Sequence, residues 1–223
     1  MTTAMRYPIP AGEYRQVAEI TRSRFITTVA HTPTVFEAEA FIARIRAEFP
    51  DATHNCWAYV VGPPGSTARI GMSDDGEPHG TAGKPMLGMI LHGDTGDTAA
   101  VVTRYYGGTK LGTGGLVRAY GGCVQRTLQE MPRSERVDRE ELVVTLEYSA
   151  LEGVRANALE HEAEISAQEF GEFVRLTMQV PVMNREALER ALQDTTRGRA
   201  MVSAGSEGTP RSGAEAGDEE QGG

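Results

Sequence analysis

Cysteine is nearly absent from this sequence, with Cys56 and Cys123 as its two examples among 223 residues. Two cysteines cannot build a disulfide framework or a cysteine-rich zinc site. The five histidines include no H-x-x-x-H pair, so we expect neither a metal nor a cofactor. Long apolar runs and the charged-then-apolar start of a signal peptide are also missing. We therefore expect a cytoplasmic protein without membrane contact.

Positive charge is in short supply as well, because the net charge is −9. On its own this balance argues against nonspecific binding to nucleic acid, although it does not exclude a local basic patch. The last twenty residues, 204–223, hold five acidic residues and one arginine, so −4 belongs to them and −5 to the rest. They are rich in Gly, Ser and Glu, and we predict a disordered acidic tail.

Apolar periodicity predicts an α+β protein of two domains. In the first, residues 10–131, the pattern predicts strands at 14–20, 24–31, 54–61, 68–72 and 98–103. Thr34-Val-Phe-Glu37 is a capping box and predicts the start of a helix that ends before Pro50. Met86, Leu87, Ile90 and Leu91 predict a short helix that is capped by Thr81 or Gly83 and closed by Gly93. A further helix is expected over 116–128.

The stretch 132–140 is polar and charged, and we interpret it as a linker. Beyond it, residues 141–203 have the element order β-α-β-β-α-β of a ferredoxin-like domain. Ser149-Ala-Leu-Glu152 is a second capping box, and Asn184 is expected to cap the last helix. In the strand 173–180 apolar residues alternate with Arg175, Thr177 and Gln179, so base stacking on this sheet is not indicated.

A glycine-rich stretch, 104–122, connects a buried strand to a helix and contains seven glycines. It matches neither the P-loop nor the dinucleotide-binding fingerprint. A glycine loop at a helix N-terminus can still present backbone N–H groups to an anion, and Arg104, Lys110 and Arg118 add positive charge. The alternative is that the glycines only permit tight turns and close packing, which Gly121 and Gly122 favour.

A second unusual stretch, 73–85, carries Asp74, Asp75 and Glu77 in a loop. Three interpretations compete: a site for a hard cation, a general acid/base pair that uses His79 or Glu77, and a structural turn. In the structural turn, the carboxylates accept backbone N–H bonds and favour the next helix's positive end. The residues alone favour this third interpretation.

Cys56 lies two residues after His54 on a predicted strand, so their side chains share a face. This makes a nucleophilic pair feasible. No third orienting group is evident, and a small buried cysteine is the common case. The catalytic residues, if the protein is an enzyme, are unknown at this point.

Three segments together resemble the YigZ/IMPACT family, in its bacterial two-domain form. They are Ser73-Asp-Asp-Gly-Glu-Pro78, Gly80-Thr-Ala-Gly-Lys-Pro85 and the run from Val102 to Tyr120, with Ser23-Arg-Phe-Ile26 in agreement. The resemblance covers about residues 10–203. It implies an N-terminal domain like the second domain of ribosomal protein S-five, and a C-terminal domain similar to domains III and V of elongation factor G.

For function the resemblance implies a role in translation or nucleic-acid binding, without an established reaction. We expect an accessory factor that binds RNA or a ribosome-associated protein, with no DNA sequence readout indicated. The alternatives are a hydrolase or phosphate-ester enzyme, and a protein-interaction module. Candidate binding residues, drawn from both motifs, are Asp74, Asp75, Glu77, Thr81, Lys84, Arg104, Tyr105, Tyr106, Gly107, Gly108, Lys110, Gly112, Gly114, Gly115 and Arg118. The cations would contact phosphates, and the two tyrosines would stack on bases.

Overall fold

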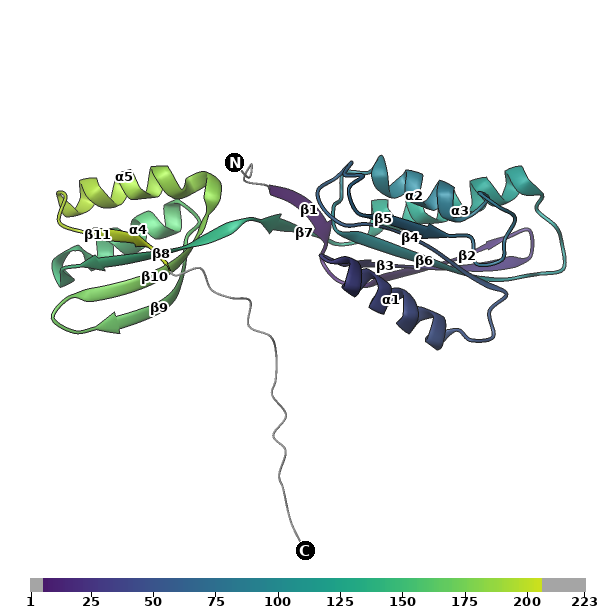
Figure 1. Ribbon diagram of the computed structural model, residues 1–223, viewed down its shortest axis with the longest axis horizontal. Coiled ribbons are helices and arrows are strands. Elements are labelled where there is room, and N and C mark those ends of the chain that lie inside the picture. Colours follow the sequence, from purple (N-terminus) through teal and green to yellow (C-terminus); the bar gives the residue numbers. More distant parts are fainter. Residues whose placement is uncertain (1–5, 206–223) are drawn as a thin grey trace, which may run out of the picture. The chain divides into compact units, whose positions relative to one another are not determined.

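The computed structural model describes residues 6–205, which divide into an N-terminal domain that ends at Val137 and a C-terminal domain that begins at Asp138 (Figure 1). The predicted acidic tail, 204–223, lies outside the described residues from position 206 onward, but its first residue, Ala204, belongs to a strand. No helix among residues 6–205 is long and apolar enough to cross a membrane.

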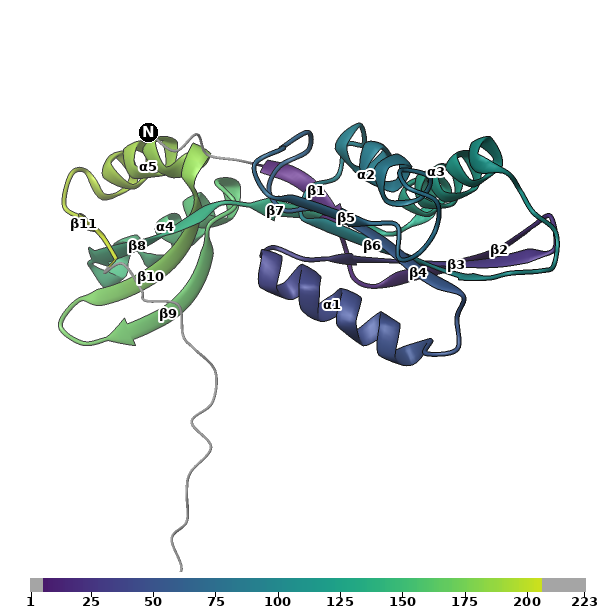
Figure 2. The ribbon, with the colours of Figure 1, turned by 45° about the vertical axis from the view of Figure 1, so that its right-hand side comes forward.

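The N-terminal domain is built on a five-stranded antiparallel sheet with helices on both faces. Helix α1 (Val35–Glu48) covers one face, and α2 (Gly83–Leu91) and α3 (Thr113–Glu130) cover the other (Figures 1 and 2). Each face therefore has its own buried apolar cluster, and the β-branched central strand is buried on both sides. The strands, in spatial order, are β2 (Tyr14–Ile20), β3 (Ser23–His31), β6 (Thr98–Tyr105), β4 (His54–Val60) and β5 (Ile70–Ser73).

Helix α1 begins where the first capping box predicts. The Thr34 hydroxyl accepts a hydrogen bond from the Glu37 backbone N–H at 3.2 Å. It also donates to the Glu37 carboxylate at 2.8 Å, so the two residues close the helix end together. The apolar stripe of α1 then buries Ala38, Phe41 and Ile45 against the sheet.

A two-stranded ribbon adds to this domain and corrects the predicted linker. Strand β7 (Arg133–Val137), inside the stretch 132–140, pairs with β1 (Arg6–Pro10). Asp97, which is fully buried, accepts hydrogen bonds from Tyr7 at 2.8 Å and Arg136 at 2.7 Å. The stretch is polar like a linker because a two-stranded ribbon is narrow. Its charged side chains therefore reach solvent or, for Arg136, the Asp97 carboxylate.

The C-terminal domain has the predicted ferredoxin-like order. Its apolar face, including Leu176 and Met178 of β10, packs under the two helices, while β9 is largely exposed. Its strands in spatial order are β11 (Met201–Ala204), β8 (Arg139–Leu146), β10 (Val174–Pro181) and β9 (Glu164–Phe170), all antiparallel, with helices α4 (Leu151–Glu160) and α5 (Arg185–Thr196). The α+β class and the two-domain architecture are confirmed.

The second capping box is wrong. Residues Tyr148–Ala150 form a 3-10 turn, and α4 starts one residue later with Ala150 as its N-cap. Ser149 donates to the Glu147 carboxylate instead of capping the helix. At Asn184 the position is right but the bond is not, because its amide donates to the His161 carbonyl.

Candidate functional site

The alternation of side chains along β6 positions the first candidate residue, Arg104. Ala100 and Val102 pack into the cluster under α2 and α3, and Arg104 follows on that face because side chains two apart share it. The sheet register sets it between Phe25 of β3 and His54 of β4. An arginine thus occupies the end of an otherwise apolar row.

Arg104 forms a buried ion pair with Glu77 from the acidic loop. Arg104 Nη1 lies 2.5 Å from Glu77 Oε1, and the two side chains are 5% and 3% exposed. Tyr120 of α3 donates to the same carboxylate oxygen at 2.7 Å, and Arg104 Nη2 donates to the Ser23 hydroxyl at 3.2 Å. One acidic residue therefore ties the sheet, the acidic loop and α3 together.

Burial leaves the Arg104 guanidinium little exposed surface for the phosphate contact that the sequence predicts. Its guanidinium lies between two rings, 5.4 Å from that of Phe25 and 5.6 Å from that of Tyr106. Glu77 balances its charge. One donor stays unused: Nε is buried and has no hydrogen-bond acceptor among residues 6–205.

Asp74 is a structural acceptor, as the third interpretation of the acidic loop requires. Its carboxylate accepts backbone N–H bonds from Gly80 at 2.7 Å, Ala82 at 3.0 Å and Gly83 at 2.8 Å. Burial alone would raise the pKa of Asp74, but these backbone bonds outweigh it and hold the pKa below its usual value. Because α2 begins at Gly83, Asp74 also caps that helix in place of the predicted Thr81 or Gly83.

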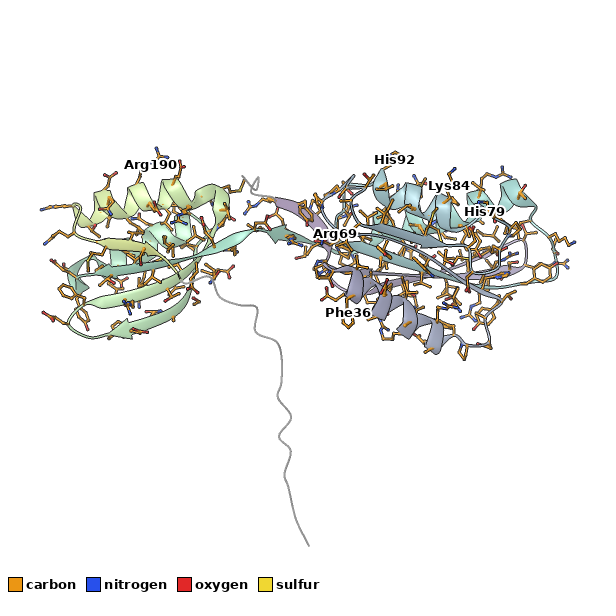
Figure 3. All side chains as sticks on the ribbon, in the orientation of Figure 1. Phe36, Arg69, His79, Lys84, His92 and Arg190 are labelled. Carbon is orange, nitrogen blue, oxygen red and sulfur yellow. The ribbon has the colours of Figure 1, made fainter. Side chains whose placement is uncertain are left out.

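The other members of the acidic loop divide between structure and solvent. Asp75 accepts from the Asn55 N–H at 2.7 Å and pairs with Arg46 at 3.1 Å. Thr81 is buried and donates to the Pro78 carbonyl. Lys84 and His79 are exposed on the α2 side of the sheet (Figure 3). Among residues 6–205, no group of three His, Cys, Asp or Glu side chains could hold a metal ion.

Cys56 is not an activated nucleophile. Burial raises the pKa of its thiol to about 12, and Sγ lies 2.9 Å from the Asp74 carbonyl oxygen. The thiolate that nucleophilic catalysis requires is therefore disfavoured at neutral pH. His54, its proposed partner, instead hydrogen-bonds the Asp75 carbonyl through Nδ1 at 2.8 Å.

The glycines of the loop allow a close backbone contact at one position and unusual backbone angles at two others. A Cβ on Gly107 would lie 1.8 Å from the Arg22 carbonyl oxygen, so this glycine allows the loop to touch the β2–β3 turn. Gly108 and Gly112 have φ values of +83° and +71°, which favour glycine. The close packing expected at Gly121 is found, because an added Cβ there would lie 3.6 Å from Pro85 Cβ and 3.9 Å from its carbonyl oxygen. At Gly122 the same expectation is wrong, because an added Cβ would meet no atom within 4 Å.

Helix α3 begins directly at this loop with an uncapped N-terminus. Gly112 is its N-cap and offers no side-chain hydrogen bond, and no acidic residue lies in the first turn. The N–H groups of Thr113, Gly114 and Gly115 have no acceptor within the helix, since a helix leaves its first donors unsatisfied. Gly114 is exposed and Gly115 half-buried. These donors carry the partial positive charge of the helix end.

The predicted cations and tyrosines lie around this helix end in unequal roles. Lys110 and Arg118 are exposed and, with Thr21, line one hollow. Tyr106 is 46% exposed. Tyr105 is half-buried, and its hydroxyl donates to Asp51 at 2.8 Å, a bond that raises its pKa. Tyr105 is thus committed to the fold, and Tyr106 is the tyrosine available for stacking.

A cleft of about 430 Å³ lies between the two motifs. Its floor is the Arg104–Glu77 pair, and the loop before α3 forms one side. The lining residues are Glu77, Pro78, Arg104, Tyr106, Lys110, Leu111, Gly112, Thr113 and Leu116. The two motifs therefore meet, while Lys84 and Arg118 are not among the residues that line this cleft.

Three residues of this hydrogen-bond network are not among the site residues predicted from the sequence. Ser23 accepts from both Arg104 and the Gly107 N–H, and Thr53 accepts from the Tyr106 N–H. Tyr120 reads as an ordinary apolar position of α3. The available signal for Tyr120 is its hydroxyl, because a buried tyrosine O–H needs an acceptor.

Both domains of the chain match known protein families. Residues 21–128 match the Impact N-terminal domain, and residues 144–199 match a domain of unknown function, DUF1949. The chain is 42% identical over 194 residues to the IMPACT family member YigZ of Escherichia coli K12, covering 87% of this chain and 95% of that protein. It is 36% identical to the family member YvyE of Bacillus subtilis over 87% and 88% of the two chains.

A solved structure agrees with both the fold and the sequence relation. The crystal structure of a hypothetical protein matches with a TM-score of 0.62 and 41% identity, covering 91% of this chain and 98% of that one. The similarities span both domains. The chain belongs to the IMPACT family.

Proposed function

We propose that this protein is an accessory factor of translation that binds RNA through its N-terminal domain. The contact region is the loop surface, which we define as the exposed side chains Arg22, Arg24, Tyr106, Lys110 and Arg118. Cations there would contact phosphates, and Tyr106 would stack on a base. The proposed role in translation rests on the resemblance of the two domains to domains of ribosomal protein S-five and elongation factor G.

The observation that carries this proposal is the distribution of unpaired cations. Most arginines of the domain lie within 4 Å of a carboxylate. Those cations of residues 6–137 for which no such pair is found are Arg22, Arg24, Arg69, Lys84, Lys110, Arg118 and Arg126, and four of the seven belong to the loop surface. An unpaired cation contacts a phosphate without first losing a partner.

Contacts within the domain hold the loop surface together. The Arg22 backbone touches Gly107, and the Arg24 guanidinium lies 6.0 Å from the Tyr105 ring. Lys110 and Arg118 line a common hollow. A net charge of −9 keeps nonspecific attraction weak, so a local cluster of this kind supplies the phosphate contacts.

The experiment compares exposed cations of the loop surface with Lys84, an exposed lysine outside it. Binding of a fluorescent single-stranded RNA is followed by anisotropy at several salt concentrations. For Lys110→Ala combined with Arg118→Ala, affinity should fall and the slope of log K against log salt should decrease by about 1.4, near 0.7 per cation. Lys84→Ala is the matched control, and its slope should stay that of the parent protein.

Binding that ignores salt, or that survives the double variant unchanged, would refute the proposal. Crosslinking in cells tests the partner directly, since it recovers RNA, ribosomes or a protein. Recovery of a protein alone, after nuclease treatment, would favour the interaction-module alternative instead.

A further inference from the structure

The cleft between the two motifs contains donors that the protein itself leaves unused. It is lined at one end by the start of α3, where Gly112 provides no capping side chain. At its floor lies Arg104, which is 4% exposed and whose Nε–H has no acceptor among residues 6–205. An unsatisfied buried donor is costly, so the two features together point to a ligand with oxygen acceptors.

The α3 end of the cleft suits a negatively charged group. The N–H groups of Thr113, Gly114 and Gly115 and the helix dipole act together at one point, as at other helix ends that bind phosphate. Lys110 lines the cleft on this side, and the first turn of α3 has no acidic residue to compete with a ligand. Arg104 adds a hydrogen-bond donor but little net charge, because Glu77 neutralises it.

The remaining walls suit a flat, partly apolar group. Pro78, Leu111 and Leu116 supply aliphatic surface, and Tyr106 supplies a ring. The Tyr106 ring also lies 5.6 Å from the Arg104 guanidinium, so a base beside this half-exposed ring would lie close to Arg104. A volume of about 430 Å³ falls within the range of pockets that hold one small molecule.

We propose that this cleft binds one nucleoside phosphate, with a phosphate monoester at the α3 N-terminus and the base beside Tyr106. A monoester presents three oxygens, whereas an internal phosphodiester presents two and must admit a sugar on either side. The inference rests on the proposed RNA-binding function and adds to it a distinct pocket. The same chemistry has two sources: a free mononucleotide and the 5′-phosphorylated end of an RNA strand.

The test is an NMR titration of the ¹⁵N-labelled full chain with adenosine 5′-monophosphate, with adenosine as the control. Adenosine 5′-monophosphate should shift the resonances of the Gly114 and Gly115 amides and of the Arg104 Nε–H in a saturable manner. Adenosine, which has no phosphate group, should leave the two amide resonances in place. If the monophosphate leaves these three signals unmoved up to millimolar concentration, the proposal is overturned.

One substitution removes a single donor with little damage to the helix. Thr113 is the first residue of α3, where proline is tolerated, and Gly112 has a ψ of 165° that accommodates a following proline. Thr113→Pro deletes one N–H and should weaken monophosphate binding about ten-fold or more, whereas Thr113→Ala keeps the N–H and should bind normally. Equal affinities for the two variants would contradict the proposal.

Two oligonucleotides identify the source and separate this inference from the loop surface. The 5′-phosphorylated RNA should bind more tightly than the same RNA with a 5′-hydroxyl, and Thr113→Pro should remove that difference. The source is whichever of the phosphorylated RNA and the mononucleotide binds more tightly. If the 5′-hydroxyl RNA binds with normal salt dependence and the mononucleotide does not bind, the cleft proposal alone fails. The reverse result refutes only the loop-surface proposal.

Discussion

Replacing Glu77 tests whether burial makes the Arg104–Glu77 pair important. Glu77→Gln keeps the shape of the side chain but leaves the Arg104 guanidinium without its counter-charge, in a site where both side chains are at most 5% exposed. Removing one partner of a buried pair typically costs about 3–5 kcal/mol. With a urea dependence of about 2 kcal/mol per molar, the unfolding midpoint should fall by about 2 M.

Urea unfolding followed by tryptophan fluorescence is the assay, because Trp57, the single tryptophan, lies on β4 of the same domain. The matched control is Glu48→Gln. Glu48 pairs with Arg15 at the same 2.5 Å, but those side chains are 39% and 32% exposed. Solvent screens such a pair, so the control should leave the midpoint close to that of the parent protein.

A second variant checks the cause. In Glu77→Gln combined with Arg104→Met no charge is left buried, so the double variant should recover part of the loss seen in Glu77→Gln. If Glu77→Gln shifts the midpoint no more than Glu48→Gln does, the reasoning from burial is refuted. Additive losses in the double variant would contradict the direct coupling of the two residues.

Further predictions concern the thiols, the acidic loop and the glycines. Because burial raises the pKa of Cys56 to about 12 and also raises the pKa of Cys123, neither thiol should react with a thiol reagent at pH 8 until urea unfolds the chain; rapid native labelling would contradict this. Asp74→Ala should destabilise the domain by about 1–3 kcal/mol, because three backbone donors lose their acceptor. Since the folded pKa of Asp74 is lowered, its contribution is present above the ordinary aspartate pKa of about 3.9 and is lost as pH falls through the folded value, so an acid titration of the variant should be flatter there. Gly107→Ala should lower stability and RNA affinity, because its methyl group would overlap the Arg22 carbonyl, whereas Gly122→Ala, exposed in α3, should stabilise by up to about 1 kcal/mol in thermal unfolding.

Local sequence patterns predict much of the fold. The Thr34 capping box, the alternation in β10 and the order of elements in the C-terminal domain all appear as predicted. The second capping box failed because a 3-10 turn shifts the start of α4, which no local pattern signals. The ribbon could not be predicted because β1 and β7 are more than 120 residues apart in the sequence. Such a pairing depends on contacts that composition does not encode.

The site was predicted in its parts but not in its connections. The sequence predicts both motifs and a phosphate contact for Arg104, but it does not predict that Arg104 is buried, because a charged residue is almost never buried without a partner. Its partner, Glu77, lies 27 positions earlier in a different motif. The sheet register and the path of the acidic loop are both required to bring the two together, and neither follows from spacing.

The ribbon of β1 and β7 has a practical consequence for dissecting this protein. A fragment cut at the edges of the Impact N-terminal match, 21–128, would lose both of its strands and also β2. Asp97 would then keep its place in the interior but lose the Tyr7 hydroxyl and the Arg136 guanidinium. The boundaries of inherited similarity and the boundaries of independent folding therefore differ here, and a minimal stable N-terminal piece should extend from residue 6 to residue 137.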